Sequence, residues 1–300
     1  MINRQITLAV RPVGIPEPAH FRLVGSELAA LAPGELLVRN LFLSVDPAQR
    51  GYVNEENNYV PPVPVGAVMR ALAVGQVVES HHEGFRPGEY LYGWFGWQEY
   101  CIAPPAAVLR RVDPGQATLS QAAGVLGING LTAAIALRGI GQPKAGETVL
   151  VTAGAGGVGS IVGQLAKAAG CRTVAVVGSE EKGRQCLSEF GYDHYIDYHG
   201  DLEAGLAVAC AEGIDVFFDN VAGPVADRIV RRMKWFGRII QCGTISIPTW
   251  LPVPQGPRIE REILTRRLRL EGFVIFDHLA RFDAVAAELA ALLKAGRLQV

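Results

Sequence analysis

The sequence has few cysteines, and those that it contains are not clustered. There are five, at positions 101, 171, 186, 210 and 242, and no two of them form a CxxC pair. An odd and scattered set of thiols argues against a disulfide framework, and a structural zinc site needs clustered thiolates. The pattern is typical of reduced thiols, so we expect a cytoplasmic protein.

A strong charge bias and long hydrophobic runs are also lacking. The 28 Lys and Arg residues nearly balance 29 Asp and Glu residues, which gives a net charge of −1. This balance does not favour a nucleic acid or an anionic membrane as a partner. No apolar run reaches membrane-spanning length, and the opening residues MINRQITLAV do not resemble a signal peptide. We therefore expect neither nucleic acid nor membrane as a partner.

Histidine is scarce as well. Of the six histidines only His81 and His82 are adjacent, in a turn-like segment, ESHHEGFRPG, that we expect to face solvent. Catalytic zinc is held by three protein ligands such as His, Cys or Glu, and no such grouping is evident. We therefore expect no metal site.

Glycine and proline are plentiful, and the sequence pattern between them differs in the two parts of the chain. Up to about residue 120, short apolar runs between glycines and prolines predict a small all-β domain of barrel or sandwich type. These runs are ITLAV, GELLVRNLFLSVD, ALAVGQVVES, GEYLYG and WQEYCIA. We expect Ser120 to cap the helical segment that follows, SQAAGVLGINGLTAAIALRGIG, in which glycines interrupt the helical spacing.

From Glu147 onward, predicted strands alternate with predicted helices. The strands are expected at 148–152, 173–177, 195–197, 214–218, 237–241 and 270–276. The helices are expected at 159–169, 180–190, about 201–211, 224–235 and 279–295. Such alternation predicts βαβ crossovers and a parallel sheet. We therefore predict an α/β protein with a β domain at residues 1–121 and a Rossmann domain at residues 122–295.

The most informative stretch is the turn between the strand 148–152 and the helix 159–169. Gly154, Gly156 and Gly159 fit the pattern G-x-G-x-x-G. In dinucleotide-binding folds one glycine permits the tight turn, another lets the backbone approach a pyrophosphate, and the third lets the helix pack close to the strand. The start of the helix offers unpaired N–H groups to the anion. An ordinary glycine-rich turn is the alternative.

The second strand of the predicted Rossmann domain bears on the choice of cofactor. An NAD site places Asp or Glu near its end to hold the ribose 2′-hydroxyl. This strand ends instead in Gly178 and Ser179, with Lys182 shortly after. A small hydroxyl side chain and a cation suit an adenosine 2′-phosphate, so NADP(H) is favoured over NAD(H). Alternatively, residues 180–184 are simply a solvated helix start.

Other candidate cofactor residues follow the carboxyl ends of the later strands, which face the ligand crevice in such sheets. Tyr198 either lies near the adenosine phosphate or is a half-buried structural residue. Asn220 is a candidate contact to the ribose or the nicotinamide, and Gly243 lets the backbone approach the nicotinamide side. We expect Cys242 to pack rather than react, because the sequence shows no neighbouring base or cation.

These residues resemble those of a known family, the medium-chain dehydrogenase/reductases. The resemblance is to its zinc-free branch, which contains prostaglandin reductase (leukotriene B4 12-hydroxydehydrogenase), plant alkenal double-bond reductases and bacterial curcumin reductase. It covers nearly the whole chain. The matching stretches are LFLSVDPAQRGYV (41–53), NYVPPVPVGAVMRALAVGQVV (58–78), LGINGLTAA (126–134), AGETVLVTAGAGGVGSIVGQLAKAAGC (145–171), GSEEK (178–182), FDNVAG (218–223), MKWFGRIIQCGTIS (233–246) and LEGFVIF (270–276).

The resemblance implies a GroES-like β domain, a Rossmann domain that binds NADP(H), and a homodimer. It also implies roles for single residues. The pyrophosphate would lie on Gly156, Gly157, Val158 and Gly159, and the 2′-phosphate end on Lys182 and Tyr198. Asn220, Cys242, Gly243 and Ser246 would contact the nicotinamide half, Phe273, Val274 and Ile275 would wall it, and Gly130 and Thr132 would lie where the first Rossmann helix meets the cofactor.

Three departures from the family pattern concern the site. The family's DPYM motif reads Asp-Pro-Ala-Gln at 46–49, so its tyrosine is lost, and whether nearby Tyr52 replaces it stays open. A second family tyrosine falls at about Pro248. Family members also continue past the position of Val300 with strands that return to the first domain. We therefore expect residues 296–300 to begin such a return segment in a shortened chain.

The residues favour one type of chemistry. Without a Lewis acid, hydride addition to the β-carbon of an α,β-unsaturated ketone or aldehyde is easier than reduction of an unactivated carbonyl. A hydrogen-bond donor to the enolate oxygen that forms is worth about 3–4 kcal/mol. Tyr59 is the best candidate for this donor, because it matches a tyrosine that the bacterial branch keeps beside the substrate, although a merely packing tyrosine is the alternative. Arg50 is either an electrostatic residue of the substrate pocket or a surface residue.

The sequence therefore predicts an NADPH-dependent reductase of activated carbon–carbon double bonds. Two other functions stay open. One is a zinc-free NADPH quinone oxidoreductase on the same scaffold. Asp46 and Pro47 do not favour this function, because the quinone branch tends to read SVN at this place. The other is a non-catalytic protein that binds NADPH as a redox sensor or scaffold.

Overall fold

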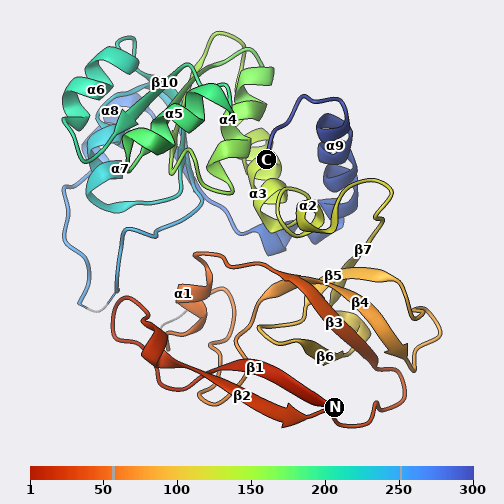
Figure 1. The fold of residues 1–300 in the computed structure, drawn as a ribbon. Helices are drawn as coiled ribbons and strands as arrows, with labels where there is room; N and C mark the ends of the chain where they lie inside the picture. The colour runs from red at the N-terminus through yellow and green to blue at the C-terminus, as the bar shows by residue number, and fades with distance from the viewer. Residues whose placement is uncertain (56–57, 251) are drawn as a thin grey trace. The chain divides into compact units, whose positions relative to one another are not determined.

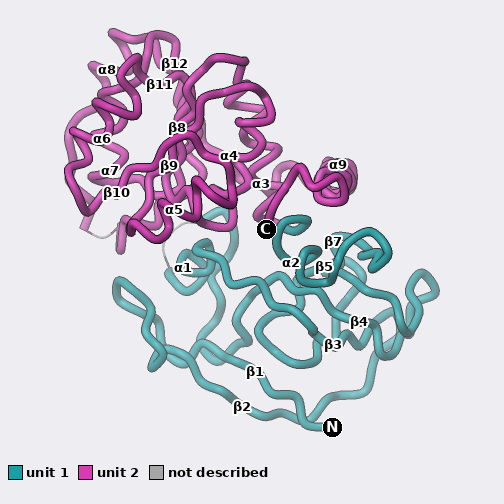
Figure 2. Tube along the Cα trace, turned by 45° about the horizontal axis from the view of Figure 1, so that its top comes forward, with its two compact units in different colours: residues 1–127 teal, residues 128–300 magenta. Residues whose placement is uncertain are grey.

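The computed structural model describes residues 1–55, 58–250 and 252–300. The chain forms two compact units, unit 1 at residues 1–127 and unit 2 at residues 128–300, which Figure 2 shows in teal and magenta. The boundary that we predicted after residue 121 falls inside the short helix α2 (Leu119–Ala123). This helix contacts strands β3 and β4 of unit 1.

Unit 1 is built from two antiparallel sheets (Figure 1). The larger has the strand order β6-β3-β4-β5-β7 and the smaller pairs β1 with β2. The strands are β1 (Ile2–Leu8), β2 (Phe21–Glu27), β3 (Leu36–Leu43), β4 (Leu72–Ser80), β5 (Tyr90–Trp94), β6 (Tyr100–Ala103) and β7 (Val108–Val112). Short helices η1 (Pro18–His20), α1 (Gln49–Tyr52) and η2 (Pro105–Ala107) lie between them.

The core of the larger sheet follows from the two-residue period of its strands. Leu36 and Val38 on β3 and Ala73 and Val77 on β4 are buried and pack with Phe95. Side chains two residues apart point to the same face of a strand, so Leu36 and Val38 on β3, and Ala73 and Val77 on β4, share a face with their own strand partner. The predicted all-β character of this region is confirmed.

Unit 2 is a parallel sheet with the strand order β10-β9-β8-β11-β12-β13. Its strands are β8 (Thr148–Thr152), β9 (Arg172–Val177), β10 (His194–Asp197), β11 (Ile214–Asp219), β12 (Met233–Gln241) and β13 (Arg269–Gly272). Its helices are α3 (Ile128–Ala136), the π-helical η3 (Leu137–Gly141), α4 (Gly159–Ala168), α5 (Glu180–Ser188), α6 (Leu202–Ala209), α7 (Gly223–Val230), α8 (Glu260–Arg266), the 3-10 helix η4 (Ile275–Arg281) and α9 (Phe282–Lys294). The predicted Rossmann-type fold is confirmed.

Helices cover both faces of this sheet. On one face, residues of α6 and α7 such as Leu206 and Ile229 share a core with Leu150 and Phe217 of the strands. On the other, η3 approaches Ile240 and Val216 so closely that a Cβ on Gly141 would lie about 3 Å from both. Because helices lie on both faces, every residue of β8 is buried, and the three between its terminal threonines are apolar.

Four sequence predictions need correction. The N-cap of α2 is Thr118, which accepts from Gln121 N–H in a capping box, so Ser120 lies within the helix. The helix expected at 224–235 ends at Val230, because Met233 already joins β12 and pairs with Ile214. The strand expected at 270–276 ends at Gly272, where its pairing with β12 ends. Helix α8 was not predicted.

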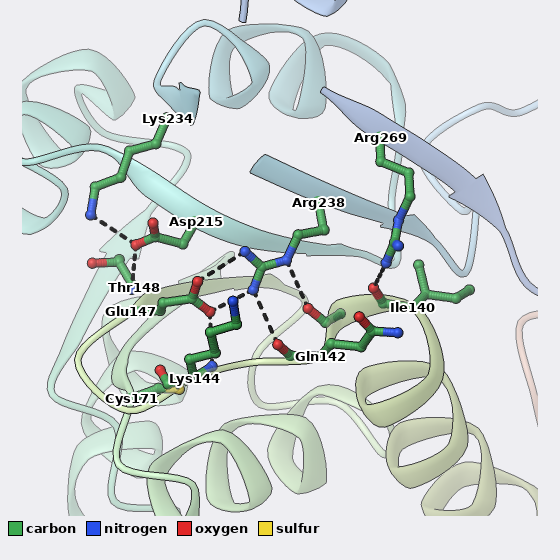
Figure 3. Close-up of polar contacts among 11 residues, drawn as sticks. Ile140, Gln142, Lys144, Glu147, Thr148, Cys171, Asp215, Lys234, Arg238 and Arg269 are labelled. Atoms are coloured by element: carbon green, nitrogen blue, oxygen red, sulfur yellow. Dashed lines mark hydrogen bonds and ion pairs between the residues drawn. The ribbon is translucent and has the colours of Figure 1, made fainter. Parts of the chain in front are cut away.

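A cluster of charged side chains ties the amino-terminal edge of the sheet to the end of η3 (Figure 3). The guanidinium of Arg238 on β12 forms a salt bridge with Glu147 at 2.5 Å and donates to the carbonyl oxygens of Gly141 at 2.9 Å and Gln142 at 3.3 Å. Arg269 on β13 donates to the carbonyl of Ile140. Cations at these carbonyls suit the carboxyl-terminal end of a helix.

No helix in the described part of the chain combines the length and the apolar character needed to cross a bilayer.

Candidate active site

The glycine turn after β8 is held close to its surroundings. A Cβ on Gly154 would lie 2.6 Å from Cβ of Ala175 on β9, and one on Gly159 would lie 2.2 Å from the carbonyl oxygen of Ala153. Neither position has room for a side chain, so both glycines are required by close approach. The turn therefore lies tightly against β9 and leads straight into α4.

The turn presents free backbone donors. The N–H of Ser160 donates to the carbonyl oxygen of Gly156, and the N–H of Val162 donates to that of Val158. Within the described residues, the N–H groups of Gly157, Val158 and Gly159 donate to no protein atom. Unpaired N–H groups at the amino terminus of a ten-residue helix form a site for an anion such as a pyrophosphate.

Helix α3 borders the same turn. A Cβ on Gly157 would lie 3.0 Å from Nδ2 of Asn129, so the Asn129 amide lies directly beside the turn. Gly130 and Thr132, which we predicted to meet the cofactor, are buried on α3. Asn129 was not predicted from the sequence, where its one signal is its place between the glycines of LGING.

The predicted 2′-phosphate residues gather at the ends of β9 and β10. The Ser179 hydroxyl caps α5 by accepting from Lys182 N–H at 3.3 Å. Lys182 is exposed, and its ammonium has no ion-pair partner among the described residues. Tyr198 is 39% exposed, and its hydroxyl lies 2.9 Å from where a Cβ on Gly178 would be. This corner offers a cation and two hydroxyls to a ligand.

Buried Asp219 organises the loops that follow β11 and β12. Its carboxylate accepts from Thr152 Oγ1 at 2.8 Å, from the N–H groups of Val221 and Ala222 at 2.9 and 3.1 Å, and from Gln241 Nε2 at 3.1 Å. Burial raises the pKa of Asp219, and these hydrogen bonds oppose the shift. This role of Asp219 was not predicted from the sequence, although Asp219 stands directly before the predicted Asn220.

The predicted nicotinamide-side residues are held by main-chain carbonyl oxygens near Asp219. Asn220 donates through Nδ2 to the carbonyl oxygen of Thr152 at 2.7 Å. Cys242 and Gly243 donate their N–H groups to the carbonyl oxygen of Asp219 at 2.8 and 3.1 Å. Ser246 donates through Oγ to the carbonyl of Ala222 at 3.0 Å. The structure therefore brings all four residues together at the carboxyl ends of β11 and β12.

The loop after β11 is strained at Ala222. Its backbone has φ 57° and ψ −160°, a conformation that is favourable only for glycine. Two hydrogen bonds from its N–H to the Asp219 carboxylate, each 3.1 Å, hold it there. Such strain is found where the surrounding structure imposes one conformation, as ligand-binding loops require.

Cys242 is poorly suited to act as a nucleophile. Burial and the nearby Asp219 carboxylate raise the pKa of its thiol to about 12. The thiolate is the reactive form of cysteine, and it is scarce at neutral pH when the pKa is this high.

The residues predicted to wall the nicotinamide follow β13 rather than lie on it. The N–H of Phe273 donates to the carbonyl oxygen of Gln241 at 3.1 Å. The ring of Phe273 stacks on the ring of His278 with 5.0 Å between centroids. Ile275 is buried at the start of η4. Phe273 and Val274 are partly exposed, so they are the two of the three that can meet a ligand.

The catalytic and substrate candidates lie in unit 1. Tyr59 is 49% exposed, and its ring meets that of Tyr52 edge-on with 6.3 Å between centroids. The two hydroxyls are hydrogen-bonded. Tyr52 is 2% exposed, so a buried ring supports the exposed ring of Tyr59. Burial and Tyr59 raise the pKa of Tyr52, and the cation of Arg70 opposes that shift.

Arg70 was not recognised from the sequence. Its guanidinium lies 5.5 Å from the centroid of the Tyr52 ring and donates to the carbonyl oxygen of Pro61 at 2.6 Å. It thus ties the segment after Tyr59 to the start of β4. The predicted pocket residue Arg50 lies on α1, half-buried.

Among the described residues, no three His, Cys, Asp or Glu side chains are grouped so that they could hold a metal ion. His81 pairs with Glu79 at 3.0 Å instead.

Comparison with known families and structures gives matches over both units. Residues 4–111 match the family "N-terminal domain of oxidoreductase", and residues 157–296 match "Zinc-binding dehydrogenase". The chain is 40% identical to the NADPH-dependent curcumin reductase of Escherichia coli, over 91% of this chain and 80% of the relative. It is 34% identical to the NADP(+)-dependent 2-alkenal reductase of Nicotiana tabacum, over 99% of this chain and 88% of the relative.

A solved structure is similar as well. The crystal structure of CurA in complex with NADPH from Vibrio vulnificus superposes with a TM-score of 0.92 at 38% identity. The match covers 99% of this chain and 89% of that one.

Proposed function

Because the chain belongs to the medium-chain dehydrogenase/reductases, in the zinc-free branch of curcumin and alkenal reductases, we propose that it is an NADPH-dependent reductase. Its substrates are α,β-unsaturated ketones and aldehydes, and the reaction adds hydride to the β-carbon. The names of its relatives include an NADPH-dependent curcumin reductase and a 2-alkenal reductase.

The observation that carries the proposal is the carboxyl edge of the sheet in unit 2. Free N–H groups at Gly157 to Gly159 fit a pyrophosphate. Ser179 and Lys182 fit a 2′-phosphate, and the two residues at the tip of β9, Gly178 and Ser179, carry no charge. The residues present therefore fit NADP(H), whose dihydronicotinamide supplies the hydride when bound.

The protein's own residues then have three tasks. The backbone donors and Lys182 bind the anionic groups and fix the cofactor's position. Asn220, Gly243 and the strained loop at Ala222 form a rigid surface for its nicotinamide half, with Asp219 beneath them. Tyr59 donates a hydrogen bond to the carbonyl oxygen of the substrate, where negative charge develops as the β-carbon accepts hydride.

Replacing Tyr59 with phenylalanine should lower kcat more than tenfold, because the enolate oxygen loses a donor that is worth most in the transition state. Steady-state kinetics with a simple enone measures this. Tyr90→Phe, which removes another partly exposed phenol from unit 1, is the control and should leave kcat unchanged. An unchanged rate in Tyr59→Phe would remove this residue from the mechanism.

The function itself is tested by a substrate panel. The purified protein should oxidise NADPH, and NADH far more slowly, in the presence of enals and enones. Turnover of quinones alone would favour the quinone oxidoreductase instead. Tight binding of NADPH without turnover of any compound would indicate a non-catalytic protein and contradict the proposal.

We further propose a homodimer in the cytoplasm. The outer strand β13 pairs on one side only, with β12, and all four of its residues are exposed. An open strand edge favours pairing with a second chain. All five cysteines are free, which suits a reducing compartment. Light scattering at micromolar concentration should give twice the chain mass, and a monomer mass would contradict the dimer.

A further inference from the structure

Tyr192 is a buried tyrosine in the segment that joins α5 to β10, and none of the roles above uses it. It is 4% exposed. Its hydroxyl donates to the carbonyl oxygen of Gly159 at 2.7 Å. Gly159 is the first residue of α4, so the Tyr192 hydroxyl is anchored on the first turn of this helix.

The Tyr192 ring fills a space that glycines leave open. A Cβ on Gly163 would lie 2.1 Å from the ring, so this position on α4 must be glycine while the ring is present. A Cβ on Gly154 would lie 3.6 Å from the same ring. The ring is thus packed against both the first turns of α4 and the glycine turn that precedes them.

The segment that carries this tyrosine is firmly attached. Tyr192 N–H donates to the carbonyl of Cys186 on α5 at 3.0 Å. The carboxylate of Asp193 accepts from Thr173 N–H on β9 at 2.9 Å and forms a salt bridge with Lys167 on α4. Residues 192 and 193 therefore hold both ends of α4, the first turn through a hydroxyl and the last through a carboxylate.

We propose that Tyr192 is a positioning residue for the pyrophosphate of the dinucleotide, because its hydroxyl fixes the orientation of the first turn of α4. The N–H groups of Gly157, Val158 and Gly159 are continuous with that turn, so their direction depends on it. The inference rests on the proposed function, in which these donors bind NADPH.

Removing the hydroxyl has a definite consequence. In Tyr192→Phe, the carbonyl oxygen of Gly159 loses the hydrogen bond from the buried hydroxyl, so the first turn of α4 loses its anchor to the segment before β10. The three donors that precede and begin this turn are then held less firmly toward the pyrophosphate. The corner at Ser179 and Lys182 lies at the ends of β9 and α5 and is not touched by this change.

Two ligands separate these two parts of the site. NADPH needs both the glycine turn and the 2′-phosphate corner, whereas adenosine 2′-monophosphate carries the 2′-phosphate without a pyrophosphate. In Tyr192→Phe, the Kd of NADPH should rise about tenfold and the Kd of adenosine 2′-monophosphate should not change. Fluorescence titration and calorimetry without substrate, well below the melting temperature, measure both constants.

The chain offers matched controls. Tyr195 packs its ring on Gly183 of α5, where a Cβ would lie 2.2 Å away, much as Tyr192 packs on Gly163 of α4. Tyr195→Phe should leave both Kd values unchanged. Lys182→Ala should weaken both ligands. Gly163→Ala, which displaces the Tyr192 ring, is a second test and should weaken NADPH alone.

The outcomes are distinct. A Kd of NADPH that is unchanged in both Tyr192→Phe and Gly163→Ala would overturn the inference, and so would equal weakening of both ligands, which indicates a general structural role. If the wild-type protein bound adenosine 2′-monophosphate but not NADPH, the glycine turn would have no pyrophosphate to hold, and the inference would fall. If it bound neither ligand, the proposed function would fail with it.

Discussion

Replacing Arg238 with alanine is expected to lower the free energy of unfolding by about 3 kcal/mol, because a partly buried carboxylate loses its counter-ion. The side chains of Arg238 and Glu147 are only 16% and 18% exposed. The same change leaves the carbonyls of Gly141 and Gln142 at the end of η3 without this donor. Urea denaturation measures the difference.

The control for Arg238 is a surface ion pair that also joins two elements of unit 2. Arg138 contacts Glu288 through two hydrogen bonds of 2.5 and 2.6 Å, but these side chains are 39% and 47% exposed. An exposed pair contributes about 0–1 kcal/mol. Arg138→Ala should therefore cost much less, and equal losses in the two variants would contradict the argument from burial.

The same pair predicts a pH dependence. Burial acts to raise the pKa of Glu147, but hydrogen bonds from Arg238 and Lys144 N–H, together with the charges of these two residues, hold it below its ordinary value of 4.5. A carboxylate with a lowered pKa stabilises the fold above its unfolded pKa, and this stabilisation is lost as pH falls through the native pKa. In Arg238→Ala the loss of stability below pH 4.5 should be shallower than in the wild type.

Asp219→Asn is the second change with a large expected effect, also about 3 kcal/mol. Both carboxylate oxygens accept hydrogen bonds from donors, one from Thr152 and Val221, the other from Gln241, and both from Ala222. An amide must place its NH2 at one of these positions, so either orientation sets a donor against donors. The loop at Ala222 loses what holds its strained backbone, and we expect the Kd of NADPH to rise as well.

The control for Asp219 is on the same strand. Asp215, at the other end of β11, accepts from Thr148 N–H and Lys234 Nζ, both at 2.8 Å. Asp215→Asn should lower stability but leave the Kd of NADPH unchanged, since no predicted cofactor residue contacts it. Calorimetric melting and NADPH titration of both variants give the comparison. Equal effects on NADPH would mean that Asp219 acts on overall stability alone.

The sequence predicted the central part of unit 2 closely because its signals are local. Strand β8 is a β-branched apolar run, and the glycine turn and the amino-terminal end of α4 follow at once. The end of α7 was harder, since nothing in residues 231–236 marks a switch of period. Only the pairing of Ile214 with Met233 on the neighbouring strand shows that β12 has begun.

For the site, sequence patterns and family resemblance pointed to residues at strand ends, and the structure brings Asn220, Cys242, Gly243 and Ser246 together there. Residues that act through contacts from distant segments escaped prediction. Tyr192 bonds to Gly159, 33 positions away, and Arg70 reaches Tyr52 across a proline loop. No sequence pattern marks a buried carboxylate such as Asp219 either, because its role depends on which hydrogen-bond donors surround it in the fold.

The buried cysteines can report where the structure opens locally. Cys101 in unit 1 and Cys171, Cys186 and Cys210 in unit 2 are buried, and burial raises the pKa of each thiol to about 11 or 12. Alkylating reagents attack the thiolate, so these four sites react only when the surrounding structure opens. Mass spectrometry of labelled peptides can then follow the unfolding of unit 1 and of unit 2 separately in a single sample.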